Sequence, residues 1–89
     1  MLSPVQSLWV GPKLSDLEIL SIKSFQKVGH KFILYTYGKV KGIPPGTKVI
    51  DANTIIKKTH LFKYKKGLLP FSDIFRYKML YEKGGYWVD

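Results

Sequence analysis

Short apolar runs alternate with two longer helical patterns along this chain of 89 residues. The runs VQSLWVG at 5–11 and KFILYTYG at 31–38 are rich in β-forming residues and close on glycine, which predicts two buried strands. After the turn GIPPGT, the segment KVID at 48–51 predicts a third, shorter strand. The final segment YWVD at 86–89 predicts a strand that enters the same sheet.

The first helical pattern begins at Ser15 and continues to Val28, with Gly29 as its end. Ser15 followed by Glu18 predicts a capping box, in which each side chain accepts a hydrogen bond from a free amide of the first turn. At about 100° per residue, one side of this helix carries apolar and small residues. They are Leu17, Leu20, Ser21, Ser24, Phe25 and Val28.

The second helical pattern begins within residues 70–72 and ends at Lys83. Gly84 or Gly85 is expected in the left-handed conformation that glycine adopts freely at a helix end. Apolar residues fall all round this helix, which predicts that it is buried. Residues 52–66 have no clean period, and we expect a short helix within ANTIIKK or a loop.

A strand, a helix and a strand at this spacing predict a βαβ unit and a mostly parallel sheet. We therefore expect one α/β domain with three layers, because 89 residues are too few for two cores. The absence of cysteine excludes a disulfide scaffold and a thiolate metal site. No apolar run approaches the roughly 20 residues of a membrane span, so we expect a soluble, cytoplasmic chain.

The formal net charge of +9 raises the question of a polyanionic partner. Fourteen of the fifteen basic residues are lysine, and Arg76 is the single arginine. Because arginine is the better ligand for phosphates and base edges, nucleic acid is not the expected partner. The alternative is a basic module that binds nucleic acid or an anionic membrane surface. Its residues would be Lys57, Lys58, Lys63, Lys65 and Lys66.

Asp73 and Arg76 lie one helical turn apart at the start of the second helix, on the same sector as apolar residues. An unpaired charge in apolar surroundings costs several kcal/mol, on the order of the loss when a buried pair is broken. The two side chains therefore need a partner, which is either each other or a ligand.

Two further residues are candidates because of where their strands end. Asp89 follows the last strand, at the edge of an α/β sheet where ligands bind, and a carboxylate there suits a divalent metal that holds a diphosphate. Trp9 lies on the first strand, beside the Gly11-Pro12 turn, where it either belongs to the core or stacks on a nucleotide base. His30 and His60 lack metal-ligand spacing, and no Ser/His/Asp arrangement or phosphate-binding P-loop can be recognised.

Several segments together resemble the DXD-containing, sugar-binding glycosyltransferases of family 32. They are SLWVG, LSIKSF, FILYTY, DAN at 51–53 and above all FSDIFRYKMLYEKGGYWVD at 71–89. This family includes capsular-polysaccharide enzymes and mannosyltransferases. The resemblance covers nearly the whole chain, and its last segment is the most specific part.

The resemblance implies a GT-A fold, whose Rossmann-like sheet binds a nucleoside-diphosphate sugar. Asp73 and Arg76 match the SD-x-x-R positions that reach the donor's ribose and sugar, and Trp9 falls where such enzymes stack a base. Asp89 matches the first aspartate of the D-x-D motif, which holds Mn²⁺ or Mg²⁺ on the diphosphate.

From this resemblance we expect residues 1–89 to be the N-terminal, donor-nucleotide-binding part of a GT-A domain, cut within the D-x-D motif. The implied reaction transfers a hexose to a hydroxyl of a glycan or another acceptor, in the synthesis of a polysaccharide or glycan. A membrane surface, bound peripherally, is a further possible partner. The third interpretation is a structural fragment that binds no ligand.

Overall fold

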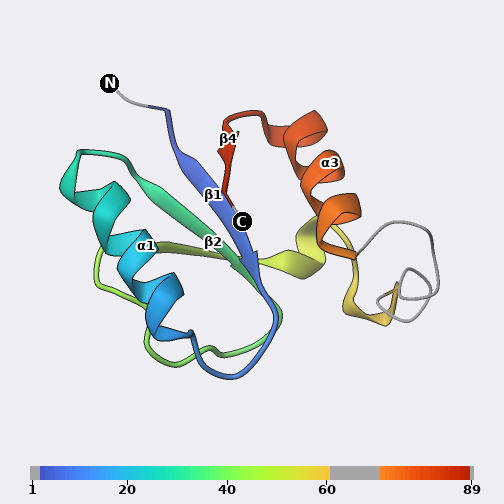
Figure 1. The fold of residues 1–89 in the computed structure, drawn as a ribbon. Helices are drawn as coiled ribbons and strands as arrows, with labels where there is room; N and C mark the ends of the chain where they lie inside the picture. Colours follow the sequence, from blue (N-terminus) through green and yellow to red (C-terminus); the bar gives the residue numbers. More distant parts are fainter. Residues whose placement is uncertain (1–2, 61–70, 89) are drawn as a thin grey trace.

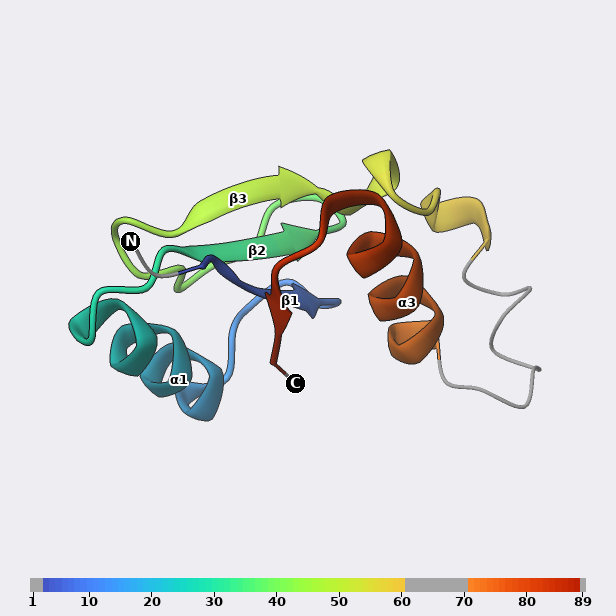
Figure 2. The same ribbon diagram turned by 90° about the horizontal axis from the view of Figure 1, so that it is seen from above.

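Four parallel strands form a single sheet in the computed structural model, which describes residues 3–60 and 71–88. The strands are β1 (Val5–Trp9), β2 (Phe32–Thr36), β3 (Lys48–Asp51) and β4 (Tyr86–Trp87). Their order across the sheet is β3-β2-β1-β4, and every neighbouring pair is parallel. The strands β3, β2 and β1 follow one another in the view from above (Figure 2). All four strands predicted from the hydrophobic runs are confirmed.

The register of the sheet brings the carboxyl ends of three strands level with one another. Trp9 is paired with Thr36, and Thr36 is paired with Asp51. The short β4 pairs only with the first half of β1, from Val5 to Gln6. The loops that follow Trp9, Thr36 and Asp51 therefore leave the sheet side by side at one edge.

The helices α1 (Asp16–Lys27) and α3 (Phe71–Lys83) lie on opposite sides of this sheet (Figure 1). Alternate residues of the strands face each helix, as a pleated strand requires. On the α1 side the buried cluster is Val5, Leu14, Ile22, Phe32 and Leu34. On the α3 side it is Tyr35, Tyr37, Ala52, Ile55, Ile56, Phe75 and Met79. The predicted three-layer α/β arrangement is thus confirmed, and it is compatible with part of a Rossmann-like fold.

The start of α1 confirms one half of the predicted capping box. The Ser15 hydroxyl accepts a hydrogen bond from the Glu18 backbone N–H at 3.1 Å. The carboxylate half is different, because Glu18 Oε1 is buried without a hydrogen-bond partner among the described residues. Burial accordingly raises the pKa of Glu18. The cap therefore depends on the serine.

The apolar side that the sequence singled out on α1 packs only in part, through Phe25, which contacts the buried cluster on the α1 side. Leu17, Leu20 and Val28 are 77%, 62% and 64% exposed. Ile22 is fully buried instead, with Ile19 partly buried beside it. The apolar residues of α1 span more of the wheel than one sheet face can cover, and contact with the sheet selected the stripe around Ile22.

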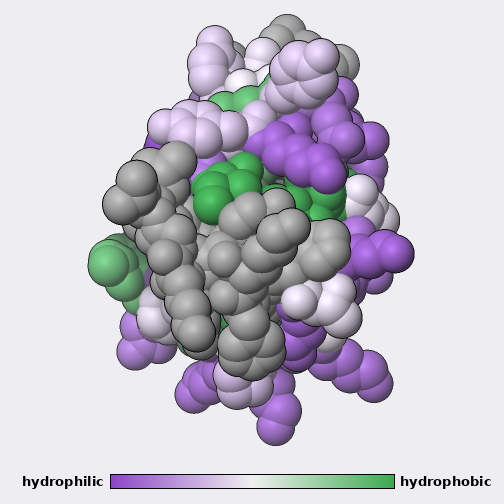
Figure 3. Space-filling model, turned by 90° about the vertical axis from the view of Figure 1, so that its right-hand side faces the viewer, coloured by the Kyte–Doolittle hydropathy of each residue, from purple (hydrophilic) through white to green (hydrophobic). Residues whose placement is uncertain are grey.

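The prediction of a helix buried all round is likewise wrong for α3. Phe75 and Met79 are fully buried, whereas Tyr77 and Tyr81 are 55% and 92% exposed. One stripe of α3 covers the sheet, and the tyrosines lie away from it. Where this side is drawn in colour, hydrophilic side chains predominate at the surface and hydrophobic ones appear in small groups (Figure 3). No helix in the described ranges is long and apolar enough to cross a membrane.

Two short 3₁₀ turns follow β3, in the segment for which the sequence allowed either a short helix or a loop. They are η1 (Ala52–Thr54) and η2 (Lys58–His60). Ala52 and Ile55 are buried in the cluster under α3. The rest of the uncertain segment, residues 61–66, lies outside the described residues.

A buried glutamine joins the two halves of the fold. Gln6 is 3% exposed, and its Nε2 donates to the Gly84 carbonyl at 2.7 Å. Its Oε1 accepts from the Tyr35 hydroxyl at 3.1 Å. Gly84 and Gly85 have φ angles of 70° and 89°, as predicted for the end of α3. This turn directs the chain into β4.

We expect Gly85→Ala to destabilise the fold more than Gly84→Ala. Either change costs about 1 to 2 kcal/mol because both positions have left-handed φ angles. At Gly85 the new methyl group would also collide with the Gln6 amide, whereas at Gly84 it meets nothing within 4 Å. Disturbing the buried Gln6 hydrogen bonds brings the Gly85→Ala loss to roughly 3 kcal/mol. Urea unfolding measures both variants, and equal losses would show that Gln6 does not restrict this turn.

Candidate functional site

The carboxyl edge of the sheet is the candidate site, because open parallel sheets bind ligands outside the carboxyl ends of their strands. A pocket of about 320 Å³ lies there. Its lining comes from the loops after β1 and β2 and from η2. The residues are Val10, Gly11, Pro12, Tyr37, Lys39 and Lys58.

The loop after β3 is held in one conformation by Asp51 and Asn53. Asp51 Oδ1 accepts hydrogen bonds from the backbone N–H of Asn53 at 2.9 Å and from its Nδ2 at 2.8 Å. Asn53 Oδ1 in turn accepts from the backbone N–H of Lys58 at 2.8 Å. The backbone bond from Asn53, followed by its side-chain bond, lowers the pKa of Asp51. This chain of bonds fixes the start of η2, from which Lys58 reaches the pocket.

Tyr37 ties the same loop to the end of β2. Its hydroxyl donates to the Ile56 carbonyl at 2.6 Å. Burial, with a smaller contribution from the negative charge of Asp51, raises the pKa of Tyr37 to about 12. The phenol is therefore neutral near pH 7 and acts as a hydrogen-bond donor to the loop.

The electrostatics of the pocket favour an anion. Lys39 and Lys58 line it and are exposed, so their ammonium groups remain hydrated. Lysine contributes a point charge rather than a planar set of donors, which suits a phosphate group without selecting a particular base. Asp51, at the end of the neighbouring strand, offsets part of this positive charge.

Trp9 lies at this edge, as the sequence predicted. It ends β1 and is half-buried, and its Nε1 donates to the Lys13 carbonyl at 3.0 Å. Its ring packs against the cluster under α1. The indole thus has a structural role on the α1 side, and stacking on a base stays a prediction.

Asp73 and Arg76 lie in the first turns of α3 and pair with each other. Arg76 Nη2 is 3.5 Å from Asp73 Oδ1, and the side chains are 28% and 31% exposed, for Arg76 and Asp73 respectively. Arg76 also donates to the Tyr77 hydroxyl at 3.2 Å, with its guanidinium carbon 4.9 Å from the centre of that ring. The sequence expected both charges to be buried, and they are only partly so. These contacts hold the Arg76 guanidinium in one position before any ligand binds.

The contact between Phe75 and Tyr37 places this turn of α3 near the carboxyl end of β2. Their ring centroids are 6.5 Å apart in an edge-to-face arrangement. The beginning of α3 therefore lies at the same edge of the sheet as the strand ends (Figure 1).

The structure does not bring the four predicted site residues into one described pocket. Trp9 packs on the α1 side, whereas Asp73 and Arg76 belong to the helix on the other side. None of these three is among the described residues that line the edge pocket. Asp89 lies outside the described residues. That all four residues serve one donor site, as the resemblance implies, stays a prediction.

Sequence reasoning missed the residues that shape the edge pocket. In the sequence, Tyr37 lies in a predicted strand and Lys39 in the loop that follows it, and no motif marks either residue. Asp51 and Asn53 did carry a signal, because an Asp or Asn after a strand commonly bonds to the backbone two residues on. That pattern could have predicted the fixed loop, although not its contact with Lys58.

No group of three or more His, Cys, Asp or Glu residues that could hold a metal ion occurs in the part of the chain that the structure describes. Because Mg²⁺ in nucleotide sites is usually held by one or two carboxylates together with substrate phosphates, a single carboxylate can contribute to such a site. Asp89 is the metal-ligand candidate that the resemblance implies.

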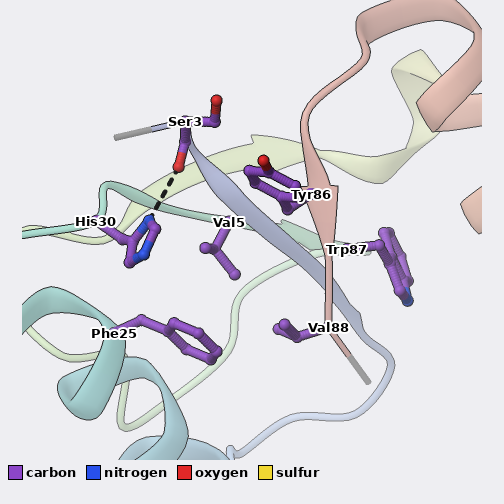
Figure 4. Close-up of a pocket in the computed structure, with 7 residues that line it drawn as sticks. All are labelled: Ser3, Val5, Phe25, His30, Tyr86, Trp87 and Val88. Carbon is purple, nitrogen blue, oxygen red and sulfur yellow. Dashed lines mark hydrogen bonds between the residues drawn. The ribbon is translucent and has the colours of Figure 1, made fainter. Parts of the chain in front are cut away.

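A larger pocket, of about 580 Å³, lies at the opposite end of the sheet (Figure 4). Val5, Phe25 and Val88 line its apolar part. His30 is held at its rim, with Nδ1 3.0 Å from the Ser3 carbonyl oxygen. Because it opens near the amino ends of β1 and β4, where parallel sheets seldom bind ligands, we place the candidate site at the carboxyl edge despite its smaller pocket.

No protein-family model, curated protein or solved structure matches the chain. The resemblance of the sequence and the geometry of the site are therefore the observations that indicate a function.

We expect Asn53→Ala to raise the pKa of Asp51 toward its ordinary value. The rise should be partial, because the backbone N–H of residue 53 continues to donate to the carboxylate. A carboxylate whose pKa is lowered by folding stabilises the folded state at pH values above its unfolded-state pKa, and this stabilisation is lost as the pH falls. Asn53→Ala should therefore make the free energy of unfolding fall less on acidification than it does in the wild type. A pH titration followed by NMR measures the Asp51 pKa directly.

Thr54→Ala is the matched control for this titration. It removes the bond from the Thr54 hydroxyl to the Asp51 carbonyl and leaves both bonds to the carboxylate. The Asp51 pKa should stay lowered in this variant. An unchanged pKa in Asn53→Ala would contradict the role assigned to the amide.

Proposed function

We propose that the chain is the donor-nucleotide part of a metal-dependent glycosyltransferase with a GT-A fold. It would bind a nucleoside-diphosphate sugar, whose hexose is transferred to a hydroxyl of a glycan or another acceptor. The observation that carries the proposal is the strand order β3-β2-β1-β4.

This order gives the sheet a point where the strand order reverses, because β2 and β3 lie on one side of β1 and β4 lies on the other. In the sequence α1 lies between β1 and β2, and α3 lies between β3 and β4, with the two helices on opposite faces. In open α/β sheets, the crevice at such a reversal is where nucleotides bind. Here the reversal falls between β1 and β4. Trp9 ends the first of these strands, and Asp89 follows the second in the sequence.

The pair of Asp73 and Arg76 supports a role in holding the donor. Asp73 and Tyr77 hold the guanidinium on the first turns of α3. A guanidinium fixed in this way loses little freedom when it binds sugar or ribose hydroxyls, which favours affinity. Lys39 and Lys58, at the same edge, supply positive potential for a diphosphate.

Mn²⁺ or Mg²⁺ belongs to the proposal through the resemblance alone, with Asp89 as the residue that would contribute a carboxylate oxygen. When bound, such an ion neutralises charge on the departing diphosphate. The protein itself would bind and orient the nucleotide at the crevice between β1 and β4, where the strand order reverses.

The basic-module alternative has a clear experimental signature. Lys57 and Lys58 are exposed, and the other lysines assigned to it lie outside the described residues. Binding through lysine–phosphate contacts falls steeply with salt, whereas donor binding is expected to depend on divalent metal. Titrations of the same protein at two salt concentrations separate the two functions.

We expect Arg76→Lys to weaken binding of uridine or guanosine diphosphate by about tenfold, because an ammonium cannot reproduce the planar array of donors. Calorimetric titration of each nucleotide measures the affinity. Lys78→Gln is the control, since it removes an exposed charge on the same helix. Unchanged affinity in Arg76→Lys, with wild-type binding intact, would remove this residue from the donor site.

A second titration addresses the metal. Asp89→Asn should keep the melting temperature but reduce the gain in nucleotide affinity that Mn²⁺ provides, because it removes a charged oxygen ligand. Asp16→Asn, at an exposed carboxylate of α1, should leave that gain unchanged. If Asp89→Asn showed wild-type affinity and wild-type metal dependence, Asp89 would not be a metal ligand.

A further inference from the structure

The outer face of α1 presents aliphatic side chains to solvent. Leu17, Leu20 and Val28 are 77%, 62% and 64% exposed, while Ile22 alone among the residues of this helix is fully buried. In Figure 1, α1 lies on one side of the sheet, and the segment between β2 and β3 runs beside it. That segment contacts Ile19 and Gln26, which lie on the far side of the helix from Leu17 and Leu20. Packing of the core does not explain why these aliphatic side chains lie on the surface.

The exposed residues form one continuous stripe. At 100° per residue, Leu17, Leu20, Ser24 and Val28 fall within an arc of about 80°. Ser24 does not interrupt the apolar character of this stripe, because its hydroxyl already donates to the Leu20 carbonyl at 2.8 Å. We call these four residues the outer stripe of α1.

Lysines border the outer stripe. Lys23 and Lys27 lie next to Leu20 on the helical wheel, and Lys31 follows the helix; all three are exposed. Asp16, exposed in the first turn, falls between Lys23 and Lys27 on the helical wheel, and Glu18 is half-buried on the opposite flank. Beyond the first turn, the charge that borders the outer stripe is positive.

The composition of this face favours a lipid surface over a protein surface. Cores of protein interfaces are enriched in aromatic residues, methionine and arginine and depleted in lysine. The outer stripe instead consists of Leu, Val and Ser, and its border carries Lys23, Lys27 and the single acidic residue Asp16. Lysine stems can lie along apolar surface while their ammonium groups reach lipid phosphates. Helices that lie in a membrane interface combine these features.

We propose that α1 docks the protein on an anionic lipid bilayer, with the outer stripe in the headgroup region and Lys23 and Lys27 on lipid phosphates. The formal net charge of +9 would attract the protein to such a surface before the leucines insert. This docking is independent of the glycosyltransferase proposal. It leaves the pocket at the carboxyl edge, lined from the strand-end loops, outside the docked face.

The test is flotation with vesicles of phosphatidylcholine alone and with vesicles that contain about one third phosphatidylserine. The wild-type protein should bind the anionic vesicles, less tightly at high salt, and should not bind the neutral ones. The double variant Leu17→Ser/Leu20→Ser should lose at least about tenfold in affinity. Lys23→Gln and Lys27→Gln should each lose about fivefold at low salt.

Matched controls use exposed residues away from α1. Val49→Ser replaces an aliphatic side chain that is 47% exposed on β3, and Lys78→Gln removes a charge from α3. Both should bind the anionic vesicles as the wild type does. Circular dichroism checks that each variant is folded, which we expect because the substituted side chains are exposed.

Three outcomes would overturn the proposal. The first is equal binding by the wild type and the double leucine variant. The second is an equal loss in the controls, which would indicate attraction by net charge alone. The third is a wild-type protein that ignores vesicles but self-associates in light scattering, with association abolished by Leu17→Ser/Leu20→Ser. In that case the outer stripe is a contact between copies of the chain.

Discussion

The arrangement of this fold depends on the buried amide of Gln6. It links β1 to β2 through the Tyr35 hydroxyl and to the end of α3 through the Gly84 carbonyl. A buried amide without partners costs a few kcal/mol, so this position strongly favours structures in which both partners are present. Because the Gly84 turn leads directly into β4, the same bonds place that strand beside β1. The reversal of strand order between β1 and β4 follows from this placement.

The carboxyl edge combines a rigid sheet with loops whose positions are fixed by a few hydrogen bonds. The register aligns the ends of β1, β2 and β3, and the Tyr37 hydroxyl and the Asn53 amide then hold the loop after β3. Asp73 holds Arg76 on the neighbouring helix. Such an arrangement has little conformational entropy to lose on binding, which is the usual reason that sites form on loops supported by a sheet. It supports a site for a phosphorylated ligand more directly than any single residue does.

Much of this architecture is visible in the sequence, and the misses share one cause. Trp9 was placed on the first strand and Asp73 and Arg76 at the start of the second helix, and the Ser15 cap and the Gly84 and Gly85 conformations are confirmed. The exposure of Leu17, Leu20 and Val28 on α1 was not predicted, and the tyrosines of α3 were expected inside. Both helices carry more apolar surface than one face of a small sheet can cover. Lys39 and Lys58 were not recognised as pocket residues, since they meet only after the loops fold.

The sequence by itself determined the strands, the two helices and their ends, because these depend on side chains only a few positions apart, such as Ser15 and Glu18. The tertiary structure decided the strand order, the buried stripe of each helix and the lining of the edge pocket. These depend on contacts between distant segments, of which the bond from Gln6 to Gly84, 78 positions along the chain, is the extreme case. A local pattern cannot specify such a contact, since many residues could supply the partner until the chain closes on itself. Competition for one buried surface then selects a single arrangement.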